Sequence, residues 1–120
     1  MPVCWNIDHS QRFVEVVAEG HCEAREFVTM LDAVEAEGAV PYRKLIDVVR
    51  LTGPLSGENL SAVAERVGRL RDAGPIAAVV PSGPADGLAR LFVLLADAQG
   101  RARVFRVEAV ARGWLGLLPQ

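Results

Sequence analysis

Hydroxyl side chains follow an apolar segment near the middle of the chain, at positions where a phosphate can be bound or attached. Ser56 precedes a helical pattern over 57–72, and the N–H groups and dipole of a helix amino terminus favour a phosphate there. The same hydroxyl is also a good N-cap, which stabilises a helix by about 1 kcal/mol. Thr52 is a second hydroxyl in this loop, where it can equally serve in a turn. Both interpretations of Ser56 stay open.

Asp47 places a carboxylate inside the apolar segment 42–49. It can act as a base or bind a ligand, or it can lie near the strand end and accept hydrogen bonds from the next loop. Ser82 and Gly83 begin the loop after a second apolar strand. Because the carboxyl ends of parallel strands meet at one edge of a sheet, we expect this loop near Ser56, where the two can border a binding site. The loop lacks the Gly-Lys-Ser/Thr ending of a phosphate-binding loop.

Zinc-binding residue types occur early in the chain, at Cys4, His9, His21 and Cys22. Their spacing argues against a shared metal, because Cys4 and His9 stand at opposite ends of a strand, about 16 Å apart at ~3.3 Å per residue. Both histidines lie in or beside the first hairpin, whereas the candidate serines follow later strands, so no catalytic triad is indicated. We therefore predict no metal, no cofactor and no enzymatic activity.

Hydrophobic periodicity predicts nine elements that must position these residues. Alternation over 3–8 is typical of a half-buried strand, whereas 42–49 is apolar without alternation, as in a strand covered on both faces. The predicted strands are 3–8, 12–18, 42–49, 76–80 and 102–107, and the predicted helices are 22–37, 57–72, 85–98 and 108–117. The order β-β-α-β-α-β-α-β-α predicts one α/β sandwich domain over 1–120, with a mixed five-stranded sheet and four helices.

Composition excludes several classes of protein. Apolar residues make up 51% of the 120 residues, a share typical of globular proteins. The 13 basic and 15 acidic residues leave a net charge of −2. Basic residues form no cluster, so a nucleic-acid surface is not expected. The longest apolar runs, such as 91–96, are too short to span a bilayer. The amino terminus lacks a signal-peptide pattern, and together with two cysteines this predicts a cytoplasmic protein with reduced thiols.

Segments along nearly the whole chain resemble one known family. They are Tyr-Arg-Lys-Leu-Ile-Asp at 42–47, Gly-Pro-Ile-Ala-Ala-Val at 74–79, Gly-Leu-Ala-Arg-Leu-Phe at 87–92, and Val-Phe-Arg at 104–106 followed by 109–115. In this order they resemble the anti-sigma-factor antagonists of SpoIIAA-like or STAS-like fold, especially small stand-alone bacterial members. In well-studied members of the wider family, a partner kinase phosphorylates a serine at the start of the helix after the central strand. Ser56 matches that position, but Leu55 stands where those members have aspartate.

The resemblance implies a non-enzymatic regulatory domain that binds a protein partner, with phosphorylation of Ser56 as a switch. The alternative is a module that binds a small apolar molecule or lipid in a cleft between helices. Leu55 and the surplus of apolar residues in the last two helices favour that alternative. Near the carboxyl terminus, we expect Trp114 and Leu115 in the core, and Leu117 and Leu118 at a homodimer or ligand contact.

Overall fold

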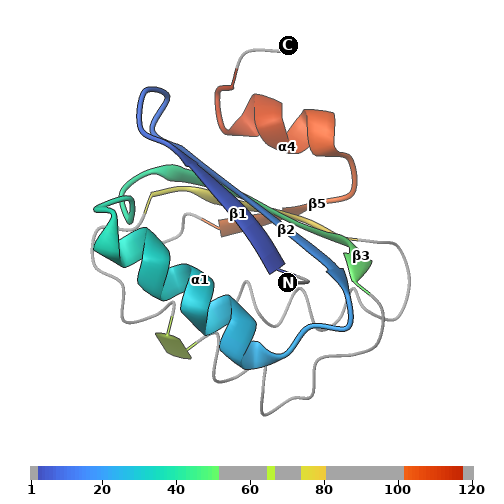
Figure 1. Ribbon diagram of the computed structural model, residues 1–120. Helices are drawn as coiled ribbons and strands as arrows, with labels where there is room; N and C mark the ends of the chain where they lie inside the picture. The colour runs from blue at the N-terminus through green and yellow to red at the C-terminus, as the bar shows by residue number, and fades with distance from the viewer. Residues whose placement is uncertain (1–2, 52–64, 67–73, 81–101, 118–120) are drawn as a thin grey trace.

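The computed structural model describes residues 3–51, 65–66, 74–80 and 102–117 (Figure 1). In these ranges five strands form one sheet, with helix α1 on one face and helix α4 on the other. The elements are, in chain order, β1 (Val3–Asp8), β2 (Phe13–Gly20), α1 (Ala24–Ala36), β3 (Arg43–Leu51), β4 (Ile76–Val79), β5 (Ala102–Phe105) and α4 (Glu108–Trp114). None of the described helices is long and apolar enough to cross a membrane.

The strands lie side by side in their chain order, β1-β2-β3-β4-β5. The first two pair antiparallel and the remaining neighbours pair parallel, so the predicted mixed five-stranded sheet is confirmed. Two of the four predicted helices are described, α1 and α4. The helices predicted over 57–72 and 85–98 lie outside the described residues, except that Glu65 and Arg66 are helical.

The core lies on both faces of the sheet, as the unbroken apolar pattern of the central strands indicates. On β3, the side chain of Leu45 is fully buried on the α4 side, whereas Ile46 packs on the α1 side. On β4, Ala77 and Val79 face α4, and Ile76 faces α1. Each face of the sheet therefore contributes alternate side chains to a separate cluster.

The β1–β2 hairpin turns where the polar segment predicts it. The carboxylate of Asp8 accepts hydrogen bonds from the hydroxyl of Ser10 at 2.7 Å and from the backbone N–H of Gln11 at 3.1 Å. These two bonds, the one from Ser10 first, lower the pKa of Asp8. An aspartate that binds its own turn in this way fixes the hairpin without any apolar contact.

Helix α1 begins and ends with local signals in the sequence. Glu23 is the N-cap, and its backbone N–H donates to the Glu26 carboxylate at 2.7 Å. At the other end Gly38 has a φ of +70°, a conformation that glycine adopts without a side-chain clash. The backbone N–H of Ala39 then donates to the Val34 carbonyl at 2.9 Å, which satisfies one of the last helical acceptors.

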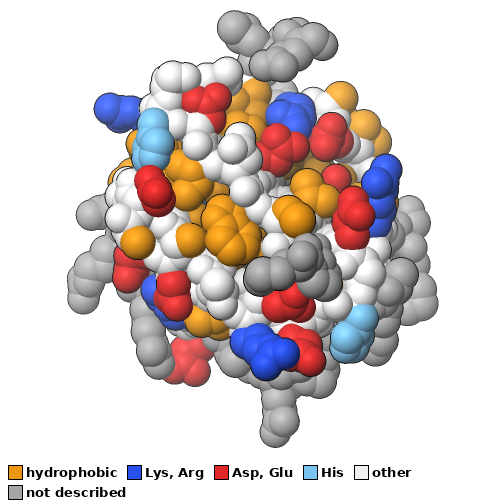
Figure 2. Space-filling view, in the orientation of Figure 1, with side chains coloured by type: hydrophobic (Ala, Val, Ile, Leu, Met, Phe, Trp, Pro, Cys, Tyr) orange, Lys and Arg blue, Asp and Glu red, His pale blue; other side chains and the backbone are white. Residues whose placement is uncertain are grey.

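The face in Figure 2 carries both signs of charge around apolar side chains. Trp5 and Ile7 of the edge strand β1 are half-buried and pack on the cluster under α1. Acidic and basic side chains lie next to one another on this face, which matches the near-neutral composition.

Candidate functional site

The predicted site at the carboxyl ends of the parallel strands is described at one residue, Asp47. Thr52, Ser56, Ser82 and Gly83 lie outside the described residues, so their grouping at one edge of the sheet stays a prediction. Asp47 lies on β3, in register with Val79 at the end of β4. Asp47 therefore lies level with the carboxyl end of β4, but four residues before β3 itself ends at Leu51.

A bulge in β3 explains why this strand holds a carboxylate. Val17 of β2 is in register with Asp47, but Glu19 is in register with Arg50, so β3 has one extra residue between these pairs. The Asp47 carboxylate accepts a hydrogen bond at 3.0 Å from the backbone N–H of Val49, inside that bulge. A bulge leaves a backbone group without its ladder partner, and Asp47 supplies one. This hydrogen bond comes from a residue of β3 itself, whereas the sequence-based interpretation expected hydrogen bonds from the next loop.

Pairing resumes beyond the bulge, which is why β3 extends past the predicted end at residue 49. Arg50 and Leu51 pair with the end of β2, and the Arg50 guanidinium lies 3.3 Å from the Glu19 carboxylate. Both side chains of this ion pair are mostly exposed, so it contributes little stability. The bulge therefore continues the central strand, and its loop begins later in the chain than the apolar pattern indicates.

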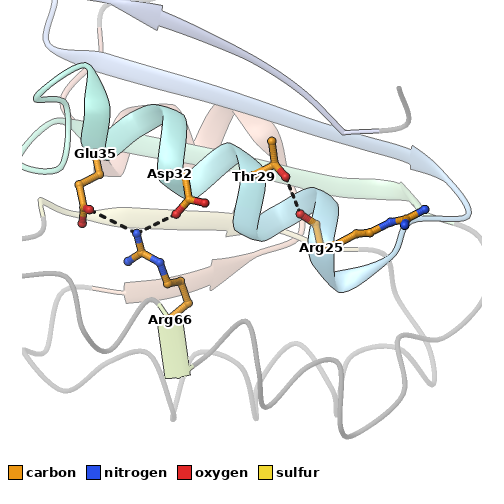
Figure 3. A network of polar contacts seen from close by, with 5 residues as sticks. All are labelled: Arg25, Thr29, Asp32, Glu35 and Arg66. Atoms are coloured by element: carbon orange, nitrogen blue, oxygen red, sulfur yellow. Dashed lines mark hydrogen bonds and ion pairs between the residues drawn. The ribbon is translucent and has the colours of Figure 1, made fainter.

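Arg66, which lies in the range of a predicted helix, contacts α1. Its guanidinium lies 3.0 Å from the Asp32 carboxylate and 3.4 Å from that of Glu35, one helical turn apart on α1 (Figure 3). The Arg66 side chain is only 19% exposed, and its hydrogen bond to Asp32 raises its pKa. A planar guanidinium can hold two carboxylates at once, so Arg66 fastens this helical residue to the α1 layer.

His9, Glu37 and Tyr42 form a polar cluster at the opposite end of the parallel strands. The ring of His9 has its Nδ1 2.7 Å from the Tyr42 hydroxyl and its Nε2 3.0 Å from the Glu37 carboxylate. Sequence reasoning placed His9 in the hairpin but named neither partner, because they are 28 and 33 residues away and no local pattern marks them. The geometry orients an imidazole between a hydroxyl and a carboxylate, as in proton relays. However, the side chains of His9 and Glu37 are about half exposed, so the cluster is solvated and chiefly joins the hairpin to the end of α1.

Lys44 is a buried cation in β3, on the α1 side of the sheet. It is 3% exposed, and its Nζ donates hydrogen bonds to the backbone carbonyls of Val40 and Tyr42. Neither contact is with a carboxylate, and burial lowers the pKa of Lys44 to about 8. A lysine at the start of an apolar strand gives no sign in the sequence that it is buried, and for that reason it was not singled out.

The four zinc-type residues do not converge at one point of the described structure. Cys4 is exposed, and its neighbours Val3 and Trp5 point into the cluster under α1, so Cys4 faces the other side. Cys22 is buried in that cluster, and its thiol donates to the Glu19 carbonyl at 3.5 Å. Among the residues that the structure describes, no three His, Cys, Asp or Glu side chains converge on a point where a metal could bind.

Helix α4 buries fewer of its apolar side chains than its periodicity predicts. Leu115 is buried beneath it, as expected, and Leu117 packs against the same cluster. Trp114 was predicted in the core and is instead 36% exposed. The structure places Ala111 against the sheet, and a small residue there lets the helix approach closely. Trp114 is thereby left on the flank of α4, above β5.

Comparison with known proteins identifies the fold. The sequence matches no protein-family profile and no curated protein. Among solved structures, the chain is similar to an uncharacterized protein of the DUF3478 family with a SpoIIAA-like fold from Shewanella loihica PV-4. The TM-score is 0.65 at 21% sequence identity, over 94% of this chain and 93% of the other. At this identity the likeness establishes the architecture alone, and on that ground the chain has the SpoIIAA-like fold.

Proposed function

We propose that this chain is a STAS-type regulatory domain that binds a protein partner and catalyses no reaction. The supporting observation is the SpoIIAA-like fold over nearly the whole chain. The polar groups that meet in the described ranges have structural uses: Asp47 completes a bulge, and the solvated cluster around His9 joins two turns. A fold alone does not dictate chemistry. We infer binding of a partner because that function does not require any of these polar groups to react.

Phosphorylation of Ser56 is the regulation that we propose for this binding. A phosphate adds a charge of about −1.5 to −2 at pH 7, which at a helix amino terminus is stabilised by N–H groups and the dipole. Arg66, in the helix predicted to begin after Ser56, is held by two carboxylates of α1. If the predicted helix runs from Ser56 to Arg66, a phosphate at its start would act on an element that Arg66 joins to α1.

Partner capture with matched variants tests both parts of the proposal. Tagged wild-type chain, Ser56→Ala, Ser56→Asp and Thr52→Asp would be expressed in the source organism, and the captured partner would then be purified for affinity measurements. We expect Ser56→Ala and Ser56→Asp to differ by about tenfold or more in Kd, which is about 1.4 kcal/mol. Thr52→Asp adds the same charge in the same loop and should leave Kd unchanged.

Two results would contradict the proposal at different levels. Equal affinities for the two Ser56 variants would refute the switch and leave partner binding in place. If no protein is enriched above an untagged control, partner binding itself is refuted.

Native mass spectrometry distinguishes the proposed switch from the alternative function, in which a small apolar molecule or lipid is bound between helices. Leu117, one of its predicted contacts, packs against the cluster around Phe13 and Leu45, and Leu118 lies outside the described residues. A phosphoryl mass on Ser56 supports the switch, whereas a co-purified small molecule supports the alternative. The same spectrum reports whether the predicted homodimer forms.

A further inference from the structure

Three apolar side chains form an exposed stripe along one flank of α4. Val107 is 54% exposed, Val110 57% and Trp114 36%. Val110 and Trp114 are four residues apart and share one side of the helix, and Val107 is its N-cap. Ala111 and Leu115, which hold α4 on the sheet, form the buried centre of the same apolar face, beside the exposed stripe. The stripe is thus additional to the surface that packs the core.

The stripe continues onto β5, the last strand at this edge of the sheet. The rings of Phe105 and Trp114 have centroids 5.6 Å apart, and the Arg103 guanidinium lies 5.8 Å from the centroid of Trp114. We call the surface made by Val107, Val110, Trp114, Phe105 and Arg103 the α4–β5 surface. It combines an apolar centre with a cation at its rim, stacked on an aromatic face.

Helix α4 holds this surface in a fixed orientation. The Arg112 guanidinium lies 2.9 Å from the Glu15 carboxylate of β2 and 3.6 Å from that of Glu108. The Arg43 guanidinium of β3 donates to the Leu115 carbonyl at 3.0 Å, just beyond the end of the helix. Because these contacts hold the carboxyl-terminal half of α4 against the sheet, a partner would meet a largely preformed surface and would have little to order.

The charges around the surface decide which partner fits it. Glu108 is engaged by Arg112, and the Arg103 guanidinium stacks on the ring of Trp114 at the edge of the apolar stripe. We propose that the α4–β5 surface binds an acidic amphipathic segment of a protein, whose apolar side chains cover the stripe and whose carboxylates meet Arg103. This proposal rests on the proposed function and assigns the surface through which the partner is bound.

Two other occupants fit the charges less well. A second copy presents the same residues, so it would meet Arg103 with no unengaged carboxylate of this surface, since Glu108 is paired with Arg112. An anionic membrane is recognised by clusters of roughly four to eight basic residues, whereas this chain has a net charge of −2.

Peptide binding with charge-matched probes tests the proposal. The probes are two fluorescein-labelled amphipathic helices with the same leucine stripe, one flanked by glutamates and the other by lysines, and binding is followed by fluorescence anisotropy. We expect the glutamate peptide to bind about tenfold or more tightly than the lysine peptide. Val110→Glu should abolish this binding, and Arg103→Glu should reverse the preference. Val49→Glu is the matched control, since Val49 is 43% exposed on β3 and lies outside the surface.

Each remaining outcome overturns the proposal. Equal binding of the two peptides, binding of neither, or an unchanged affinity of Val110→Glu would show that the surface has no preference for acidic segments. A dimer in sedimentation that Val110→Glu dissociates would assign the surface to a second copy. Co-sedimentation with phosphatidylserine vesicles that Val110→Glu abolishes would assign it to a membrane. If Val110→Glu still captures the partner found with the tagged chain, the proposed function stands and only the surface is wrong.

Discussion

Replacing Lys44 by methionine is expected to change how the stability of the fold depends on pH. Burial lowers the pKa of Lys44 from 10.5 to about 8, and its ammonium donates to the backbone carbonyls of Val40 and Tyr42. In the unfolded chain the same amine keeps its proton up to the ordinary pKa of 10.5. Between pH 8 and 10.5 the unfolded state therefore binds more protons, and the free energy of unfolding rises with pH.

The size of this effect follows from the two pKa values. One pKa unit corresponds to about 1.36 kcal/mol, so the full rise is of order 3 kcal/mol, and about 2 kcal/mol of it is reached by about pH 9.5. Burial raises the pKa of Cys22 above 9.0, with a further contribution from Glu26. The stability that the protonated thiol contributes to the fold is therefore lost as the pH rises through the pKa of Cys22 in the folded state. This opposes the Lys44 effect, but it is common to the wild type and the variant.

Urea unfolding followed by tryptophan fluorescence, at about pH 7 and about pH 9.5, measures the difference. The wild type should gain about 2 kcal/mol relative to Lys44→Met between these pH values, because contributions from all other groups cancel. Methionine is chosen because it keeps the length of the side chain and removes its charge. If the two proteins change in parallel between the two pH values, the assignment of a depressed pKa to a buried Lys44 is wrong.

Three further experiments test contacts that position the sheet and the candidate site. Gly74→Ala would place a Cβ in overlap with the backbone oxygen of Pro41, so thermal unfolding should show a loss of about 1–3 kcal/mol. A double-mutant cycle with Arg66→Met and Asp32→Asn should give a coupling of about 1 kcal/mol that weakens at high salt; zero coupling at low salt would show that Arg66 does not fasten its segment to α1. Asp47→Ala removes the partner of the bulge N–H and should lower the free energy of unfolding by about 1 kcal/mol in chemical denaturation, whereas unchanged stability would contradict the structural role of the carboxylate.

The strands could be predicted because burial on one or two faces leaves a readable pattern. Val3, Trp5 and Ile7 alternate with polar residues in β1, and every residue of β4 is apolar and buried. The exact length of β3 could not be predicted, since the bulge at Asp47 depends on the register with β2 and not on the composition of β3. A local pattern thus locates a strand, and pairing decides where it ends.

The contacts between distant residues could not be predicted, for two physical reasons. The partners of His9 lie 28 and 33 residues away, and polar side chains that meet across turns share no period. On α4, Val110, Ala111, Trp114 and Leu115 all fit one apolar face of a helix, so periodicity alone cannot separate its buried centre from its exposed flank. The resemblance in sequence identified the architecture, whereas the exposed flank of α4 required the packing to be known.

The strand order of the sheet has a consequence for how the chain can fold during synthesis. Each strand lies beside the one that precedes it in the sequence, so no strand has to wait for a later one to provide its neighbour. The β1–β2 hairpin has the shortest loop, which makes its closure the least costly in entropy. We therefore expect a vectorial mechanism, in which the hairpin forms first and β3, β4 and β5 add in turn as they leave the ribosome. The last edge to be completed is the one that carries β5 and α4, so the proposed partner surface would become available only when the rest of the sheet has formed.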